Sequence, residues 1–240
     1  MSATLLARRF GPSVAGWLVG FPFTSGPVSL FLTLEQGTAF AASAAVGSTA
    51  SVVGQAGFAL AYVASRRLGW LPATFVGTLA FASVGLVLSA LDPPALVLGL
   101  LAASVLVVAL QVMPAGQSAA GAVASPPRWD LASRAIVATV LVVTLTSLAP
   151  LVGPLVSGLV SGFPVYATVL TVFAHRASGP EAAANVMRGL VAGLFGFASF
   201  FVVVWLALES LGPALGFVLA VLSVIAVQGV SLHWLRRTKP

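Results

Sequence analysis

The amino-acid sequence predicts an all-α polytopic membrane protein of about eight transmembrane helices, forming one transmembrane domain over residues 1–240. Of the 240 residues, 59% are hydrophobic and only 7% are charged. A soluble domain carries about 25% charged residues, because its surface must face water. The surface of this chain must therefore face mostly lipid, and an internal repeat predicts that its helices form two related halves.

Eight apolar stretches account for most of the chain. A transmembrane helix needs about 20 mostly apolar residues. Charges, proline-rich joints and polar clusters separate the stretches, which cover 12–34, 38–64, 69–90, 94–113, 132–149, 151–174, 181–208 and 212–234. The region 115–129 is the only long polar loop in this division.

The charged residues predict the orientation of the helices. Basic residues stand in pairs at the ends of apolar stretches, as Arg8-Arg9, Arg66-Arg67 and Arg236-Arg237, and three of the five acidic residues fall at the opposite ends. The positive-inside rule then places both termini in the cytoplasm. We expect a multi-pass protein of the cytoplasmic (inner) membrane of a bacterium, surrounded by membrane lipid.

Several classes of function are excluded by the residue types. The chain has no cysteine, and its two histidines, His175 and His233, lie far apart. No Ser/His/Asp arrangement, HExxH pattern or acidic pair occurs, so we expect no catalytic residue, no metal site and no cofactor. The basic residues form no patch, so we expect no nucleic-acid partner.

An internal repeat relates two parts of the chain by a constant difference in residue number (162 − 20 = 142), here called the repeat offset. Gly20-Phe21-Pro22 recurs as Gly162-Phe163-Pro164, and Gly11-Pro12 recurs as Gly153-Pro154. Over 11–58, 16 of 48 positions are identical without a gap. Chance in so biased a composition would give roughly a tenth. We therefore interpret the repeat as real.

The helix count predicts that the two copies are inverted. Repeat 1 (about 11–90) holds helices 1–3 and matches helices 6–8 of repeat 2 (about 153–234), with helices 4 and 5 (about 94–149) between them. An offset of five helices is odd, so the second copy must cross the membrane in the opposite direction.

Helices 1 and 6 are each expected to break at Gly-Phe-Pro. The motif lies about ten residues into each helix, which is roughly 15 Å deep and close to the bilayer midplane. Proline removes one backbone hydrogen bond and glycine loosens the chain beside it. Such breaks are tolerated only where protein or a polar cavity satisfies the freed backbone groups. The alternative interpretation is a pair of structural proline kinks.

Two breaks at matching depth in inverted repeats resemble the secondary transporters with paired discontinuous helices, of the bile-acid symporter and sodium–proton antiporter type. The resemblance is architectural, covers about two-thirds of the chain and identifies no single family. It implies that substrate binds between the breaks. The chain departs from those proteins because it is shorter, because each half has one helix fewer, and because no acidic residue lies at mid-depth.

The candidate site consists of the breaks and the polar residues expected near them. The expected substrate-binding residues are Gly20, Phe21, Pro22, Thr24, Ser25, Gln55, Gly162, Phe163, Pro164, Tyr166, Thr168 and Asn185. Glu35, Glu181 and Arg188 are candidates for coupling or gating. Gln55 and Asn185 also fit interhelical hydrogen bonding, Glu35 a solvated helix end, and Arg188 a side chain that extends to the interface.

Small residues at helical spacing predict close helix packing after each break. They are Gly47, Ser51 and Gly54 in the second stretch, and Gly189, Gly193 and Gly196 in the seventh. Such a groove lets another helix approach closely, and we expect it to seat the broken helices.

Together these features predict a small-solute secondary transporter that works by alternating access and is not an enzyme. Half-helix N-termini at the breaks, with Arg188 nearby, favour an anionic or zwitterionic substrate. A passive channel and a non-transporting membrane subunit are the alternatives. The sequence leaves open the substrate, the coupling ion and whether the chain forms a homodimer.

Overall fold

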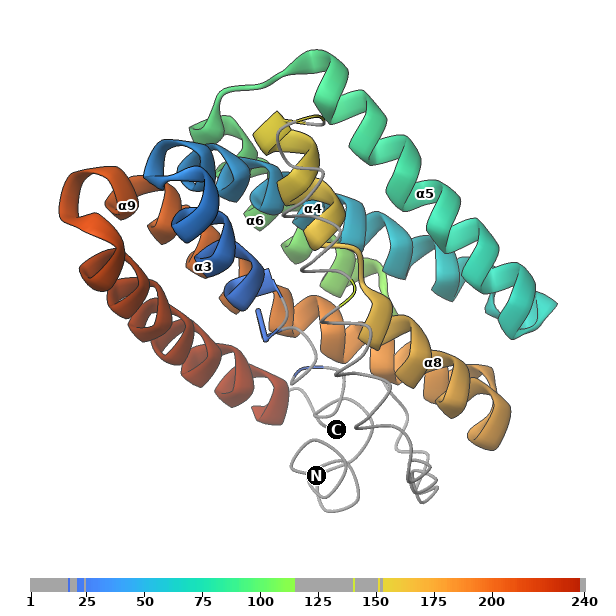
Figure 1. The fold of residues 1–240 in the computed structure, drawn as a ribbon. Helices are drawn as coiled ribbons and strands as arrows, with labels where there is room; N and C mark the ends of the chain where they lie inside the picture. Colours follow the sequence, from blue (N-terminus) through green and yellow to red (C-terminus); the bar gives the residue numbers. More distant parts are fainter. Residues whose placement is uncertain are drawn as a thin grey trace.

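Helices make up every element that the computed structural model describes. It describes residues 17, 21–23, 25–114, 140, 151 and 153–237, and no strand occurs among them. In chain order the elements are α3 (Ser25–Gln36), α4 (Thr38–Ser65), the short 3-10 helix η1 (Arg66–Leu68), α5 (Trp70–Leu91), α6 (Ala95–Val112), a helical segment at 153–161, α8 (Val165–Ser178) and α9 (Pro180–Arg237). Figure 1 shows these helices packed together as a bundle.

Five of the described stretches are long and apolar enough to cross a membrane. They are Thr38–Leu68, Trp70–Leu91, Ala95–Val112, Gly153–Ser178 and Pro180–Ser231. The prediction of a helical protein is thereby confirmed for the described residues, and several of its helices have the length and composition that membrane spans need. The count of eight stays a prediction, because part of 12–34 and nearly all of 132–149 lie outside the described residues.

The last of these stretches consists of two arms joined by a sharp turn. Gly212 has φ 78° and ψ 170°, a conformation that suits glycine, and Pro213 follows it. Figure 1 shows the first arm of α9 (180–211) and the second arm (213–237) folding back on each other. Contacts of Ser199 with Ser223 and of Gly193 with Gln228 fit an antiparallel hairpin, because one number falls as the other rises.

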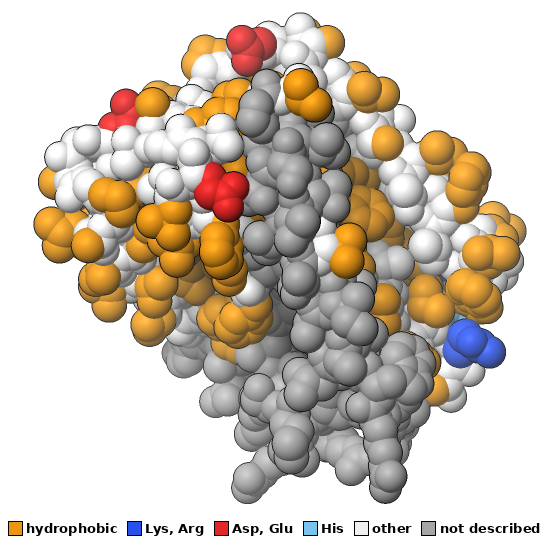
Figure 2. All heavy atoms as spheres, in the orientation of Figure 1, with side chains coloured by type: hydrophobic (Ala, Val, Ile, Leu, Met, Phe, Trp, Pro, Cys, Tyr) orange, Lys and Arg blue, Asp and Glu red, His pale blue; other side chains and the backbone are white. Residues whose placement is uncertain are grey.

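Helix α4 lies at the centre of the bundle, and α5 and α6 lie at its edge. α4 is rich in alanine, glycine and serine, whose small side chains allow neighbouring backbones to approach closely, and it is buried along most of its length. α5 and α6 are buried over a minority of theirs and expose leucine and valine side chains such as Leu86 and Leu100. Figure 2 shows the resulting hydrophobic surface, as expected of helices that face lipid.

Charged side chains gather at the two ends of the bundle. Glu35, Asp92 and Glu209 lie at helix ends on one side, here called the acidic end. Arg66, Arg67 and Arg176 lie on the other side, the basic end. Two contacts hold the basic end together: Arg66 pairs with Glu181 at 3.2 Å, and the Arg176 guanidinium lies 5.7 Å from the centre of the Trp70 ring. Figure 2 shows acidic and basic side chains on opposite parts of the surface.

Two glycine turns, separated by the repeat offset (179 − 37 = 142), reverse the chain in the same way. Gly37 (φ 88°) joins α3 to α4, and Gly179 (φ 85°) joins α8 to α9. The Gly37 N–H donates to the carbonyl of Thr33 at 3.1 Å, and the Gly179 N–H donates to that of His175 at 3.0 Å. The first turn lies at the acidic end and the second at the basic end. Segments with matching backbone turns therefore run in opposite directions.

Candidate functional site

The two Gly-Phe-Pro segments have two equivalent backbone hydrogen bonds among their described residues. After the first, the Phe23 N–H donates to the carbonyl of Phe21 at 2.8 Å. After the second, the Val165 N–H donates to that of Phe163, also at 2.8 Å. A second pair of bonds matches as well: Gly26 N–H to Pro22 carbonyl at 2.8 Å, and Thr168 N–H to Pro164 carbonyl at 2.9 Å. Every member of these bonds is displaced from its counterpart by the repeat offset.

Proline explains why the helix stops before Pro164. It has no N–H, and its ring would clash with the carbonyl four residues earlier. The preceding turn ends with hydrogen bonds that span three residues instead of four. They run from the Gly162 N–H to the Leu159 carbonyl and from the Phe163 N–H to the Val160 carbonyl, both at 3.1 Å. Helix α8 then begins at Val165, so the stretch Gly153–Ser178 consists of two half-helices.

The second break lies near mid-height in the bundle. A Cβ added to Gly162 would overlap the Ser51 side chain, and Ser51 lies near the middle of α4. The ring of Phe163 lies edge-on to Phe81, near the middle of α5, at 5.2 Å between ring centres. It also lies edge-on to Phe58 at 6.3 Å. The second break therefore lies about midway between the two ends of α4 and of α5.

Hydrogen bonds between serines bring the two breaks together. The Ser25 hydroxyl, at the start of α3, donates to the Ser161 carbonyl at 2.7 Å, just before the second break. The Ser161 hydroxyl lies 3.3 Å from the hydroxyl of Ser48, and both hydroxyls donate to the carbonyl of Gly158. Ser51 continues the group by donating to the Ser48 carbonyl. These four buried serines link α3, α4 and the segment 153–161 at the level of the breaks.

Glycine allows the segment 153–161 to pack directly on α4. A Cβ on Gly158 would overlap the carbonyl of Ala44, and one on Gly47 would overlap that of Leu155. The predicted groove therefore does seat a broken helix at Gly47. Farther along α4 the groove has another role, because Gly54 faces the Phe81 ring of α5.

The predicted substrate-binding residues divide by burial. Gly20 and Thr24 lie outside the described residues. Ser25, Gln55, Gly162, Pro164 and Asn185 are buried, and Phe21, Pro22, Phe163, Tyr166 and Thr168 are half-buried. Asn185 lies five residues into α9, near the basic end, so it is not brought to the breaks. The Thr168 hydroxyl donates to the Pro164 carbonyl and so supports the first turn of α8.

The three candidate coupling or gating residues lie away from the breaks. Glu35 is exposed near the end of α3. Glu181 pairs with Arg66 across the basic end. Arg188 donates to the carbonyls of Leu110 and Met113, at 2.7 and 2.9 Å. The last carbonyls of a helix lack partners within the helix and carry partial negative charge, so Arg188 caps α6.

Three buried polar side-chain atoms among the described residues have no hydrogen-bond partner. They are the Ser29 Oγ, the Gln55 Nε2 and the Thr171 Oγ1. A buried polar group left unsatisfied costs about 1–3 kcal/mol. The sequence interpretation included Gln55 but missed Ser29 and Thr171, although the repeat offset pairs these two hydroxyl residues. It also missed Ser161, whose counterpart is Val19.

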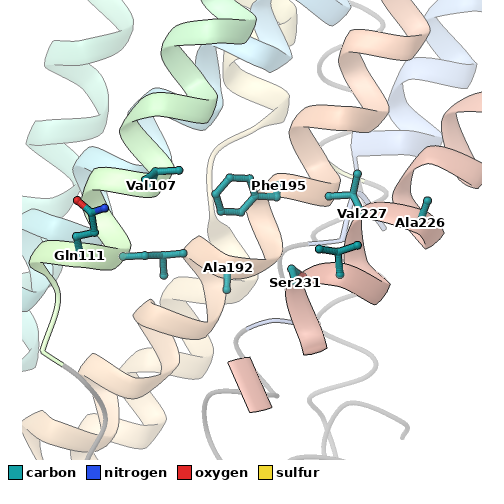
Figure 3. A pocket seen from close by; sticks show the side chains of 9 residues that line it. Val107, Gln111, Ala192, Phe195, Ala226, Val227 and Ser231 are labelled. Carbon is teal, nitrogen blue, oxygen red and sulfur yellow. The ribbon is translucent and has the colours of Figure 1, made fainter. Parts of the chain in front are cut away.

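A groove of about 650 Å³ lies elsewhere, between α6 and the two arms of α9. Figure 3 shows its lining, which includes Val107 and Gln111 of α6, Ala192 and Phe195 of the first arm of α9 and Val227 of the second. Most of this lining is apolar. None of the five Gly-Phe-Pro residues that the structure describes contributes to the groove, so its location does not match the predicted site.

No protein family, curated protein or solved structure matches the chain.

Proposed function

We propose that the chain is a small-solute secondary transporter that works by alternating access. Its two halves are inverted repeats, and the substrate binds between the two helix breaks near the middle of the membrane. Paired discontinuous helices in inverted repeats suit this role, because exchange of conformation between the halves exposes one site to each side in turn.

One observation carries the proposal. The two breaks have equivalent backbone hydrogen bonds related by the repeat offset, in segments that run in opposite directions, and the Ser25–Ser161 bond joins them. Broken backbone in the hydrocarbon region is costly unless protein or a polar cavity satisfies it. A matched pair of breaks at one place favours a shared functional reason over two independent kinks.

The distribution of charge supports one orientation. The basic end, with Arg66, Arg67 and Arg176, faces the cytoplasm under the positive-inside rule. With eight spans both termini are cytoplasmic, in the inner membrane of a bacterium. A cysteine at Asp92 then reacts with an impermeant maleimide added outside intact cells, and one at Arg67 does not. The reverse pattern would reject this orientation.

The half-helix N-termini favour an anionic or zwitterionic substrate. α3 and α8 both begin at the breaks, so the partial positive charges of their N-termini lie near mid-height. Arg188 adds little to this preference, because it is bonded to the end of α6. The Arg66–Glu181 pair fits a gating contact at the basic end, and Glu35 fits a coupling carboxylate at the acidic end.

The close packing of 153–161 on α4 favours a second candidate, a non-transporting membrane subunit. Gly158 and Gly162 both place backbone directly against α4 side chains or carbonyls. In that case the breaks serve only to fit one helix over another.

Counterflow in proteoliposomes separates these functions. Vesicles loaded with unlabelled L-alanine, acetate, phosphate or glycerol are diluted into a trace of the same labelled solute. A carrier accumulates label transiently for at least one solute, whereas a channel lets label equilibrate without overshoot. Vesicles whose flux equals that of protein-free liposomes for every solute would indicate the non-transporting subunit.

Variants of the breaks connect that flux to the site. Pro22→Ala and Pro164→Ala each restore a helical N–H where the structure has a break, so each is expected to lower counterflow by about tenfold. Pro93→Ala, in the turn between α5 and α6, is the matched control and retains wild-type flux. Equal flux in all three variants would separate transport from the breaks.

A further inference from the structure

Two of the nine buried serine and threonine residues described have unpartnered hydroxyls, and they occupy equivalent positions. Ser25, Thr33, Ser48, Thr49, Ser51, Ser157 and Ser161 each donate to a carbonyl. Ser29 and Thr171 do not, although they are 5% and 0% exposed. Their residue numbers differ by the repeat offset (171 − 29 = 142).

Both residues could satisfy their hydroxyls locally. Serine and threonine in helices commonly donate to the carbonyl four residues earlier. Thr33, on the same helix as Ser29, does so, and so does Thr168, on the same helix as Thr171. The hydroxyls of Ser29 and Thr171 make no such bond, so each is oriented away from the carbonyl four residues earlier. They do so at equivalent positions of the two halves.

The pair lies on opposite sides of the breaks. Ser29 and Thr171 each follow the proline of their break by seven residues, or about 10 Å along the helix. α3 runs towards the acidic end and α8 towards the basic end, so one hydroxyl lies on each side of mid-height. Gln55, whose Nε2 is also unpartnered, lies one turn beyond Ser51 towards the basic end.

Charged side chains are scarce between the two ends of the bundle. In the part of the chain whose side chains are described, Arg188 is the only charged residue set well inside a helix, and its guanidinium is bonded to α6. A buried net charge without a partner is costly, whereas hydroxyl and amide groups satisfy oxygen acceptors well. The unpartnered groups therefore suit a solute with oxygen acceptors and no net charge. Of the two classes that the half-helix N-termini favour, this keeps the zwitterionic solute and excludes the anionic one.

We propose that Ser29 and Thr171 are equivalent hydrogen-bonding contacts for a net-neutral solute, zwitterionic or uncharged, with Gln55 as a third contact. Ser29 binds the solute when the site opens to the acidic end, and Thr171 binds it when the site opens to the basic end. The inference rests on the proposed transport function, since it identifies the class of solute that passes between the breaks towards either end.

Stability without solute gives the first test. Removing an unpartnered buried hydroxyl costs no hydrogen bond, so purified Ser29→Ala and Thr171→Val proteins should melt at or above the wild-type temperature. Ser25→Ala, which loses its bond to Ser161, should melt lower and shows that the assay detects a lost bond. Melting of Thr171→Val as low as Ser25→Ala would mean that the hydroxyl is structurally bonded, and would overturn the proposal.

Binding and flux give the second test, with L-alanine and glycerol as net-neutral probes and acetate and phosphate as anionic probes. A net-neutral probe should show counterflow that Ser29→Ala and Thr171→Val each reduce by about tenfold, the effect of one hydrogen bond. Thr49→Val, whose hydroxyl bonds the Ala45 carbonyl, is the matched control and should match wild type. Unchanged counterflow in both variants would mean that these hydroxyls hold only water, and would overturn the proposal.

The possible outcomes distinguish failure of this inference from failure of the proposed transport function. Counterflow of acetate or phosphate but of neither net-neutral probe would reject the substrate class and leave transport standing. No counterflow of any probe by the wild-type protein would reject transport and this inference together. The KM for uptake is also measured from each side of the membrane. Ser29→Ala should raise the KM mainly for uptake from the acidic end, and Thr171→Val mainly for uptake from the basic end.

Discussion

Two helical hairpins in this protein have the same construction but are packed by different side chains. In the hairpin of α4 and α5, Gly54 faces the Phe81 ring, which an added Cβ would approach to 2.9 Å. In the hairpin formed by the arms of α9, the equivalent glycine, Gly196, faces the Gln228 side chain, whose Nε2 an added Cβ would approach to 2.5 Å. The Gln228 Nε2 also donates to the carbonyl of Gly193 at 2.7 Å.

The comparison shows that the glycine at the helix contact is common to both hairpins, whereas the side chain that packs against it differs. Glycine at the helix contact sets how closely two helices approach, and it is the same in both halves. The group that fills the space is an aromatic ring in one half and an amide in the other. Phe81 also packs on Phe163 of the second break, whereas Gln228 bonds Ser231, whose hydroxyl accepts from Trp17.

The largest expected difference between the hairpins comes from removing the aromatic ring. Phe81→Ala deletes a buried ring that contacts both Gly54 and Phe163, so we expect the free energy of unfolding to fall by about 3–5 kcal/mol. Denaturation of purified protein in detergent, followed by circular dichroism, measures the change. If Phe81→Ala lowers the free energy of unfolding by less than Gln228→Leu does, the ranking of the two hairpins is reversed.

Bulky residues in the glycine groove are expected to have the next largest effect. Gly47→Leu places a side chain against the backbone of Leu155, and overpacking costs about 1–3 kcal/mol. Gly189→Leu tests the equivalent buried position in α9 and should also destabilise. Gly57→Ala is the control, because its Cβ would meet Val84 at an ordinary 3.5 Å. Wild-type melting of both leucine variants would mean that these glycines face lipid.

Replacing the amide should have the smallest effect of the three. Gln228→Leu keeps the volume but loses the bonds to Gly193 and Ser231, and hydrogen bonds between membrane helices contribute about 0.6 kcal/mol on average. A fall of about 1 kcal/mol in the free energy of unfolding is expected from the same denaturation assay. A loss as large as that of Phe81→Ala would show that the polar contact dominates its hairpin.

Helix limits could be predicted from the sequence because glycine, proline and charge mark them. The predicted stretch 38–64 ends one residue before α4 (Thr38–Ser65) does. The stretch 69–90 begins and ends one residue before α5 (Trp70–Leu91). The stretch 151–174 ends too early, because Arg176 was taken as the boundary while Gly179, with its positive φ, ends α8. Strongly apolar stretches with glycine turns thus define helix positions well.

The contacts of individual side chains could not be predicted in the same way. A helix that is apolar all round shows no polar face, so its rotation about its own axis cannot be inferred from periodicity. The bond of Arg188 to α6, the pairing of Glu181 with Arg66 and the Ser25–Ser161 bond all depend on that rotation. Depth along the helix was predictable, and the direction in which each side chain points was not.

Accessibility of the breaks from each side of the membrane tests the central claim most directly. The chain has no cysteine, so Ser25→Cys and Ser161→Cys each introduce a single reactive thiol where the two breaks meet. An impermeant maleimide is added to right-side-out and to inside-out vesicles, and the labelled fraction is measured by mass spectrometry. Alternating access predicts labelling of both variants from both faces, whereas labelling of neither variant from either face would contradict it.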